Sequence, residues 1–180
     1  TQYGNGLYKS TDGGKTWSNK GLQKTHHIGK VIIHPENPNV VYVAAQGQYY
    51  TDNEERGVYK TTNSGNSWKK VLSIKHGKIH VGVTDLVMDP RDPNVLYATS
   101  YQRIRRPWGF SGAGPKSGIY KTVDGGKNWK KLSGGLPSGL LGKIGLAIFP
   151  RNPDILYAII EDANSPEMSY AERWIEIQNG

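Results

Sequence analysis

The 180-residue sequence contains no cysteine, which excludes disulfide bonds and thiolate metal sites. It has no apolar run near the roughly 20 residues that a membrane-spanning helix requires. No signal peptide opens it, so we expect any export signal to lie outside this segment. Histidines and carboxylates are left as metal ligands, and no His-Glu-x-x-His or similar pairing is present. We therefore predict no metal site, no cofactor and no membrane span.

The net charge is +8, which by itself is typical of nucleic-acid binding. Many of the lysines, however, recur at fixed positions, in the runs LYKS, VYKT and IYKT and in the WKK runs at 68–70 and 129–131. Lysines on outer strands discourage edge-to-edge pairing of sheets. This distribution indicates solvated sheet edges rather than a nucleic-acid surface.

An eight-residue pattern occurs three times, as STDGGKTW (10–17), TTNSGNSW (61–68) and TVDGGKNW (122–129). A second pattern accompanies it, as IIHPENPNVVYVAA (32–45), VMDPRDPNVLYATS (87–100) and IFPRNPDILYAII (148–160). Both patterns recur in step, which defines a repeat of about fifty to sixty residues.

Within each repeat, β-branched and aromatic runs alternate with Gly, Pro, Asn and Asp clusters, which indicates strands and turns. In one repeat we expect strands at 31–33, 40–44, 58–61 and 68–72. Four antiparallel strands, repeated radially, form a β-propeller blade. The sequence thus predicts an all-β propeller domain of about three blades, a partial ring. Its expected parts are the last two strands of a blade (1–19), two blades (20–72 and 73–133), and an incomplete blade with an atypical tail (134–180).

The eight-residue pattern is interpreted as a structural turn. We expect its Asp or Asn to accept hydrogen bonds from backbone amides two residues on, in an Asx-type turn, and its last glycine to supply a positive φ. The closing tryptophans are expected to be buried between neighbouring sheets, Trp68 and Trp129 almost wholly. The residues with this structural role are Ser10, Asp12, Gly14, Trp17, Thr61, Asn63, Gly65, Trp68, Thr122, Asp124, Gly126 and Trp129.

With these motifs the chain resembles the Asp-box (BNR-repeat) β-propeller superfamily. The likeness is greatest to exported bacterial sortilin-like or "glycosyl hydrolase" Asp-box repeat proteins, through the runs NEERGVYKTT, DLVMDP and YQRIRRPWGF. The superfamily includes sialidases, xyloglucan-cleaving glycosidases and sortilin-type receptor ectodomains. The resemblance implies the fold, while the functions of the superfamily diverge and its boxes lie away from its active sites. No catalytic residue is transferred from it.

Ligand sites in such a fold belong to the loops opposite the boxes. The run at 101–110 combines three arginines with aromatic residues, which indicates a pocket for an anionic or glycosidic ligand. The alternative is an arginine–aromatic stack that only braces the loop. The candidate ligand-binding residues of this and the neighbouring loop are Tyr49, Tyr50, Arg56, Tyr101, Arg103, Arg105, Arg106 and Trp108.

Three further candidates come from other loops and from an inner strand. His26 and His27 lie on a loop next to the one carrying His76 and His80, so the four could converge, although their spacing matches no metal motif. Asp85 lies on an innermost strand. We expect it either to face the channel or to form an ion pair with Lys30.

Two functions remain open at this point. The first is an extracellular or periplasmic binding platform for a glycan, peptide or protein partner. The second is a sialidase- or xyloglucanase-like glycoside hydrolase, which needs two carboxylates roughly 5–10 Å apart. Because about three blades cannot close a ring, we also expect the rest of the propeller as a partner, from the same chain or from another copy.

Overall fold

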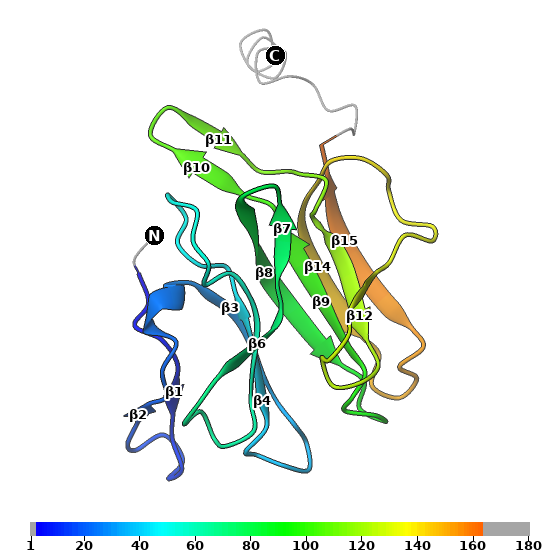
Figure 1. Ribbon diagram of the computed structural model, residues 1–180. Helices are drawn as coiled ribbons and strands as arrows, with labels where there is room; N and C mark the ends of the chain where they lie inside the picture. Colours follow the sequence, from blue (N-terminus) through cyan, green and yellow to red (C-terminus); the bar gives the residue numbers. More distant parts are fainter. Residues whose placement is uncertain (1–2, 164–180) are drawn as a thin grey trace, which may run out of the picture.

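The structure, a computed structural model, describes residues 3–163. In this part of the chain the strands form antiparallel sheets, accompanied by one short 3-10 helix, η1 (Gln23–Thr25). No helix among these residues is long and apolar enough to cross a membrane. The sheets stand side by side in a curved arc (Figure 1). This arrangement confirms the predicted all-β architecture of propeller blades.

Two sheets are complete blades of four antiparallel strands. The first consists of β3 (Ile28–Ile33), β4 (Val41–Ala45), β5 (Gly57–Thr61) and β6 (Lys69–Leu72), paired in that order. The second consists of β8 (Ile79–Met88), β9 (Leu96–Tyr101), β12 (Gly118–Thr122) and β13 (Lys130–Lys131), paired in that order. Their registers are equivalent, because Tyr42 lies opposite Lys60 in the first blade and Tyr97 opposite Lys121 in the second.

A half-blade lies at each end of the arc (Figure 1). One is the pair β1 (Tyr8–Lys9) and β2 (Ser18–Asn19), and the other is the pair β14 (Leu141–Ile148) and β15 (Leu156–Asp162). By register, β1 and β2 match the third and fourth strands of a blade, and β14 and β15 match the first and second. The atypical tail that the sequence predicts lies outside the described residues, which end at residue 163.

Two short hairpins occupy segments that the sequence assigned to loops. β7 (Ile74–His76) pairs with the first residues of β8, and β10 (Ile104–Arg106) pairs with β11 (Gly109–Ser111). The first hairpin forms because the ten-residue β8 extends beyond β9, and Gly77 supplies a positive φ of 59° at the turn. The second projects from the arc at the end where the β4–β5 loop lies (Figure 1).

Apolar side chains fill the spaces between neighbouring sheets. Between the two complete blades, Tyr42 and Val58 share a buried cluster with Leu86 and Leu96. A second cluster joins the second complete blade to the β14–β15 pair, through Tyr97, Ile119, Leu141 and Ile144. Each sheet therefore depends on its neighbours for much of its core.

The repeated turns hold a hydrogen-bond network that differs from the expected one. In the third turn the hydroxyl oxygen of Thr122 accepts from the backbone N–H groups of Asp124 (3.3 Å) and Gly126 (3.0 Å). The carboxylate of Asp124 accepts from the N–H of Asn128, four residues on, at 2.9 Å. The prediction of an Asx-type turn with a bond two residues on is therefore wrong. The same bonds recur with Ser10, Asp12, Gly14 and Thr16, and with Thr61, Asn63, Gly65 and Ser67.

Positive φ angles let the chain close these turns. Gly14, Gly65 and Gly126 have φ values of 87°, 81° and 89°, which confirms the predicted role of the last glycine. The residue before each also has a positive φ, including the non-glycine Ser64 at 61°. The turn thus contains two consecutive residues with positive φ.

The tryptophans of the turns are less buried than expected. Trp17 is 62% exposed, and Trp68 and Trp129 are half-buried, so the prediction of almost complete burial is wrong. Trp17 and Trp68 line a groove between neighbouring units that opens to solvent, and Trp129 packs only in part against the core of the complete blades. Trp68 still joins two units, because its Nε1–H donates to the carbonyl oxygen of Lys20 at 2.6 Å.

The recurring Tyr-Lys lysines also connect neighbouring units. Lys60 on β5 donates to the carbonyl oxygen of Gly125, in the turn of the next blade, at 2.9 Å. In the same way, Lys9 on β1 donates to the hydroxyl oxygen of Ser64 at 3.1 Å. Ser64 is the residue equivalent to Gly125 in the turn of the first complete blade. Because β5 is the third strand of its blade, the interpretation of these two lysines as protection of an outer edge is wrong.

Candidate functional site

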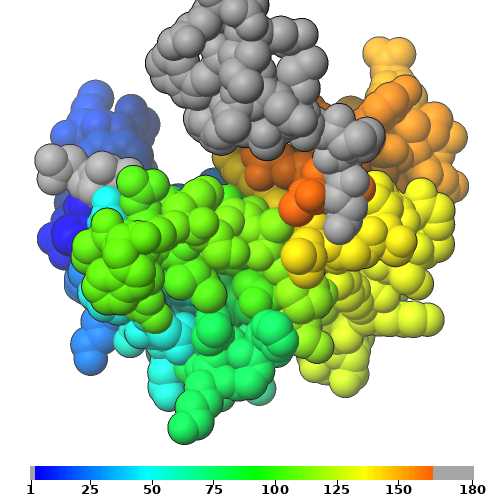
Figure 2. All heavy atoms as spheres, turned by 90° about the horizontal axis from the view of Figure 1, so that it is seen from above, coloured from blue at the N-terminus to red at the C-terminus, as the bar shows by residue number. Residues whose placement is uncertain are grey.

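The loop between β4 and β5 and the longer segment between β9 and β12 meet at one end of the arc. The strands are antiparallel, so these connections leave the blades at the end opposite the repeated turns. Seen from that end in Figure 2, the green hairpin β10–β11 lies against the cyan β4–β5 loop. Arg106 joins the two segments by donating to the carbonyl oxygen of Tyr50 at 3.3 Å.

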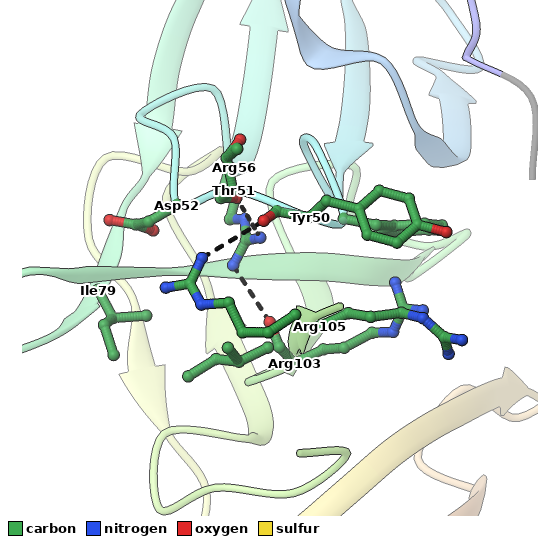
Figure 3. Close-up of a pocket in the computed structure, with 10 residues that line it drawn as sticks. Tyr50, Thr51, Asp52, Arg56, Ile79, Arg103 and Arg105 are labelled. Atoms are coloured by element: carbon green, nitrogen blue, oxygen red, sulfur yellow. Dashed lines mark hydrogen bonds between the residues drawn. The ribbon is translucent and has the colours of Figure 1, made fainter. Parts of the chain in front are cut away.

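Arg56 is buried and fastens these loops from within (Figure 3). Its Nη1 donates to the carbonyl oxygens of His80 (2.9 Å) and Arg103 (3.4 Å), and its Nη2 to those of Gln48 (2.7 Å) and Thr51 (3.1 Å). Burial lowers the pKa of Arg56 below its ordinary value, which still leaves a guanidinium charged. Because backbone oxygens occupy both terminal nitrogens, the structure favours a bracing role for Arg56 over a ligand-binding one.

A ladder of flat groups supports the hairpin. The His27 ring stacks on Tyr49 with centroids 3.7 Å apart and an interplanar angle of 11°. On the Tyr49 ring lies Arg103, whose Cζ is 4.0 Å from the ring centroid and 5.4 Å from that of Phe110. Desolvation lowers the pKa of His27, and the charge of Arg103 acts in the same direction, so the imidazole is neutral at pH 7. The ladder is thus a cation between aromatic faces.

The outer face of the hairpin is exposed. Trp108, at its tip, is 83% exposed, and Phe110 and Tyr50 are also exposed. Arg105 lies opposite Phe110 in the hairpin register, with its Cζ 5.7 Å from the ring centroid. Neither Arg105 nor Arg106 has a carboxylate partner among residues 3–163. Cationic and aromatic groups are therefore presented side by side to solvent.

A shallow crevice lies between the hairpin and the β4–β5 loop (Figure 3). Asp52 supplies the one carboxylate of its lining. Its Oδ1 accepts from the backbone N–H of His80 at 2.9 Å, and its Oδ2 lies 3.3 Å from Nδ1 of the same histidine. The lining residues are Tyr49, Tyr50, Thr51, Asp52, Arg56, Ile79, Arg103, Ile104, Arg105 and Arg106.

The candidate histidines do not converge. Nδ1 of His27 lies 2.9 Å from the carbonyl oxygen of Gly47, and Nε2 of His26 lies 2.8 Å from the side-chain nitrogen of Gln48. His76 contacts Gln102 instead, and His80 contacts Asp52. No group of three or more His, Cys, Asp or Glu residues able to hold a metal ion occurs in the described part of the chain.

Asp85 and Tyr101 are both half-buried. The Oδ2 of Asp85 accepts from the backbone N–H of Leu146 at 3.0 Å, which ties β8 to β14, and the ion pair expected with Lys30 does not form among the described residues. Tyr101 is half-buried and lines a second small crevice with Tyr49 and Arg103. Burial raises the pKa of its hydroxyl.

Two features of the site were not predicted as parts of it. One is the Asp52–His80 contact, because Asp52 reads as an ordinary loop acid and its partner lies 28 positions away. The other is the pairing of β10 with β11 as a hairpin, which brings Phe110 to the far end of the ladder. The signal for the hairpin that carries it is the Pro107-Trp108-Gly109 run between two short polar-apolar segments.

Comparisons with known proteins agree with this architecture. The family model described as "Sortilin, neurotensin receptor 3" (Sortilin-Vps10) matches residues 5–138. A protein of Neosartorya fischeri, named a probable oligoxyloglucan-reducing end-specific xyloglucanase, is 23% identical over 106 residues, which are 58% of this chain and 10% of that protein. The crystal structure of an ancestral GH74 enzyme matches with a TM-score of 0.53 and 24% identity, over 71% of this chain and 15% of the enzyme. This chain thus spans a small part of both, and the structural likeness shows the fold.

Proposed function

The chain belongs to the Sortilin-Vps10 family of β-propellers, and from this premise we propose that its loop end binds a glycan. The observation that carries the proposal is the exposure of three side chains on hairpin β10–β11, those of Trp108 at the turn and of Arg105 and Arg106 on the strand before it. Aromatic faces pack on the apolar faces of sugar rings, and guanidinium groups donate to hydroxyl or carboxylate oxygens. None of these three side chains contributes to the buried core of the described residues.

The ladder beneath the hairpin supports a binding role as well. Arg103 between Tyr49 and Phe110, and Arg56 on four backbone oxygens, hold the loops in one arrangement. A surface that is rigid before it meets its ligand loses less conformational entropy on binding. The brace and the pocket, which the sequence left as alternatives, are in this proposal two layers of one site.

One relative supports a glycan as the ligand. The curated relative is named a xyloglucanase, so its substrate is a polysaccharide. Xyloglucan oligosaccharides are therefore the first probes. An acidic oligosaccharide is the second, because Arg105 and Arg106 lack carboxylate partners within residues 3–163. Polysaccharides of this kind are met outside the cell, and we propose an extracellular or periplasmic location on that ground.

Binding is favoured over hydrolysis by the carboxylates of the site. Cleavage of a glycosidic bond uses two carboxyl groups, about 5–10 Å apart. The crevice offers Asp52, which is already held by the backbone N–H of His80. Glycoside hydrolysis is the second candidate, supported by the name of the curated relative, and it would require carboxylates from other parts of the propeller.

Calorimetric titration of the full chain with each probe tests the proposal. Trp108→Ala is expected to weaken binding about 5- to 30-fold, since loss of one stacking contact corresponds to roughly 1–2 kcal/mol. Arg105→Ala with Arg106→Ala is expected to weaken binding of the acidic probe most. The matched controls are Trp17→Ala and Lys15→Ala, which remove the same kinds of exposed side chain at the opposite end.

The possible results separate the candidates. Equal affinity of the Trp108 and Trp17 variants for both probes would overturn the proposed surface. Release of reducing ends from xyloglucan would instead support the hydrolase. An intact melting temperature in the arginine double variant is also expected, because both side chains are exposed.

A further inference from the structure

A groove lies between the two complete blades, at the end of the repeated turns. One wall is β6 with the adjacent Trp68, and the other is the turn at 122–129 of the second blade. The volume of the groove is about 480 Å³, within the range of about 300–1,000 Å³ that ligand pockets occupy. Both walls belong to blades whose four strands are described, so this inter-blade groove is internal to the chain.

Among the described residues, lysines supply all the charged side chains of the groove lining. They are Lys60, Lys69 and Lys70 from the first blade and Lys127 from the second. None of the four forms a salt bridge within residues 3–163. The carboxylate of Asp124, close to Lys127 in the chain, is already engaged by backbone N–H groups of its own turn. The groove therefore gathers positive charge from two blades.

Two of these ammonium groups are held in fixed positions. Lys60 donates to the carbonyl oxygen of Gly125 at 2.9 Å, and Lys70 donates to that of Glu54. Each also lies over a tyrosine ring of its own blade, with Nζ 5.0 Å from the ring centroid for Lys60 and 5.5 Å for Lys70. Burial lowers the pKa of Lys70, although the charges of Glu55 and Glu54 oppose the shift. An anion in the groove would favour the charged form of this lysine further.

The other two lysines are exposed, and the blades do not require them. In the β1–β2 unit Ser18 occupies the position of Lys69, since each lies opposite the recurring lysine of the third strand. In the turn of the first blade Asn66 occupies the position of Lys127. Lysine on an outer strand can also serve to discourage sheet pairing. That role does not apply to Lys127, which lies in a turn.

We propose that this inter-blade groove binds an acidic polysaccharide, whose carboxylate or sulfate groups pair with Lys69 and Lys127. An ammonium group accepts an anion from many directions, which suits the varied positions of such groups along a sugar chain. Trp68 is half-buried in the wall and offers apolar surface to a sugar ring. Single-stranded nucleic acids are held by several stacking aromatic side chains, whereas Trp68 is the one aromatic residue in the described lining.

Calorimetric titration of the full chain tests the groove, in a background where Arg105→Ala and Arg106→Ala remove the exposed cations of hairpin β10–β11. The probes are an oligogalacturonate, a dextran sulfate oligosaccharide and a neutral dextran of the same length. An acidic probe is expected to bind, more weakly as salt is added, and the neutral probe is not. Binding of the galacturonate alone or the sulfate alone identifies the group that is recognised. Absence of binding by both acidic probes would overturn the proposal.

A pair of substitutions tests the two exposed lysines. Lys69→Ser with Lys127→Asn is expected to weaken binding about 5- to 30-fold, because two ion pairs are lost. These replacements are the residues found at the equivalent positions of the preceding units, so the urea midpoint should stay unchanged. The matched control is Lys130→Ser with Lys15→Asn, the same changes at equivalent positions outside the groove lining. Equal weakening by both pairs would show that net charge alone attracts the probe, and would overturn the site.

Nuclear magnetic resonance locates the bound probe. The backbone N–H signals of Gly126 and Lys127 are expected to shift during the titration, and that of Trp108 is not. Shifts confined to the loop end would overturn the proposal. A single-stranded oligonucleotide of the same charge is expected to bind less tightly, and tighter binding would identify a nucleic-acid site instead. Since the hairpin cations are absent from every arm, these results are independent of the proposed function.

Discussion

The hydroxyl of Thr122 is predicted to stabilise the fold far more than that of Ser10, although both close the same turn. In each turn the oxygen accepts from the last glycine of the turn, at 3.0 Å from Gly126 and 2.8 Å from Gly14. Thr122 and Gly126 are buried against the preceding blade, whereas Gly14 is exposed. In Thr122→Val the side chain keeps its shape, and the buried N–H of Gly126 loses its acceptor. That loss costs about 1–3 kcal/mol of the free energy of unfolding.

Urea unfolding at pH 7 and one fixed protein concentration measures the difference. Ser10→Ala is expected to cost no more than about 0.5 kcal/mol, because water replaces the lost acceptor at an exposed turn. Thr122→Ser retains the hydroxyl and should cost less than Thr122→Val. Equal costs for Thr122→Val and Ser10→Ala would refute the reasoning, since burial is the only difference on which it depends.

Three other perturbations have defined outcomes. Trp68→Ala should lower the free energy of unfolding by about 2–4 kcal/mol, and Trp17→Ala should lower it by less than about 1 kcal/mol, because only the Trp68 indole is substantially covered. A larger loss for Trp17→Ala in urea unfolding would contradict the groove geometry. The hydroxyl and N–H of Thr16 lower the pKa of Asp12 to about 2, so its contribution is complete above pH 3.8 and is lost as the pH falls toward 2. In Asp12→Asn the urea midpoint should therefore fall less steeply between pH 4 and 2 than in the wild type. An equally steep fall would exclude Asp12 as a source of this pH dependence. Arg56→Lys should accelerate hydrogen exchange in the 46–57 loop, because an ammonium cannot reach four carbonyl oxygens in the guanidinium geometry; unaltered exchange would show that the clamp is dispensable.

The blades could be predicted from the sequence because their signals are local. Pro35 and Pro90 interrupt pairs of short β-branched runs at the same point of each repeat, and the last glycine of each turn marks a positive φ. A strand of four or five residues between two such markers has little choice of length or direction. The repetition then fixes the sheet, since one interpretation must serve every copy.

The network inside the turns could not be derived in the same way. Both the hydroxyl of Thr61 and the amide oxygen of Asn63 are acceptors within reach of several backbone N–H groups. Which N–H each one accepts from depends on two consecutive positive φ angles, and the first of them is at Ser64, a residue without that preference. That conformation follows from the fit of the turn to the preceding unit, where Ser64 receives a hydrogen bond from Lys9.

The arginines of the loop end show a similar limit. The sequence gives no means of distinguishing three arginines that lie in two loops rich in aromatic residues, Arg56, Arg103 and Arg105. Tertiary packing separates them into a buried clamp, the middle of a stacked ladder and an exposed group. Residue type therefore predicts that such a surface exists, and only the fold determines which arginine is free to bind.

The two ends of the blades differ in structure: the turn end carries contacts between neighbouring blades, and the loop end carries segments that differ from blade to blade. At the turn end, Tyr42 and Lys60 of one blade both donate to the carbonyl oxygen of Gly125 in the next, and Lys9 donates to the hydroxyl oxygen of Ser64 in the blade that follows it. At the loop end, Arg56 and the β10–β11 hairpin occur once in the described residues, on one pair of blades. Because the repeated contacts already fix the spacing of the blades, the unique loops can differ from one blade to the next without loss of the fold. A ligand that discriminates between positions around the ring must therefore be recognised at the loop end, where the blades are not alike.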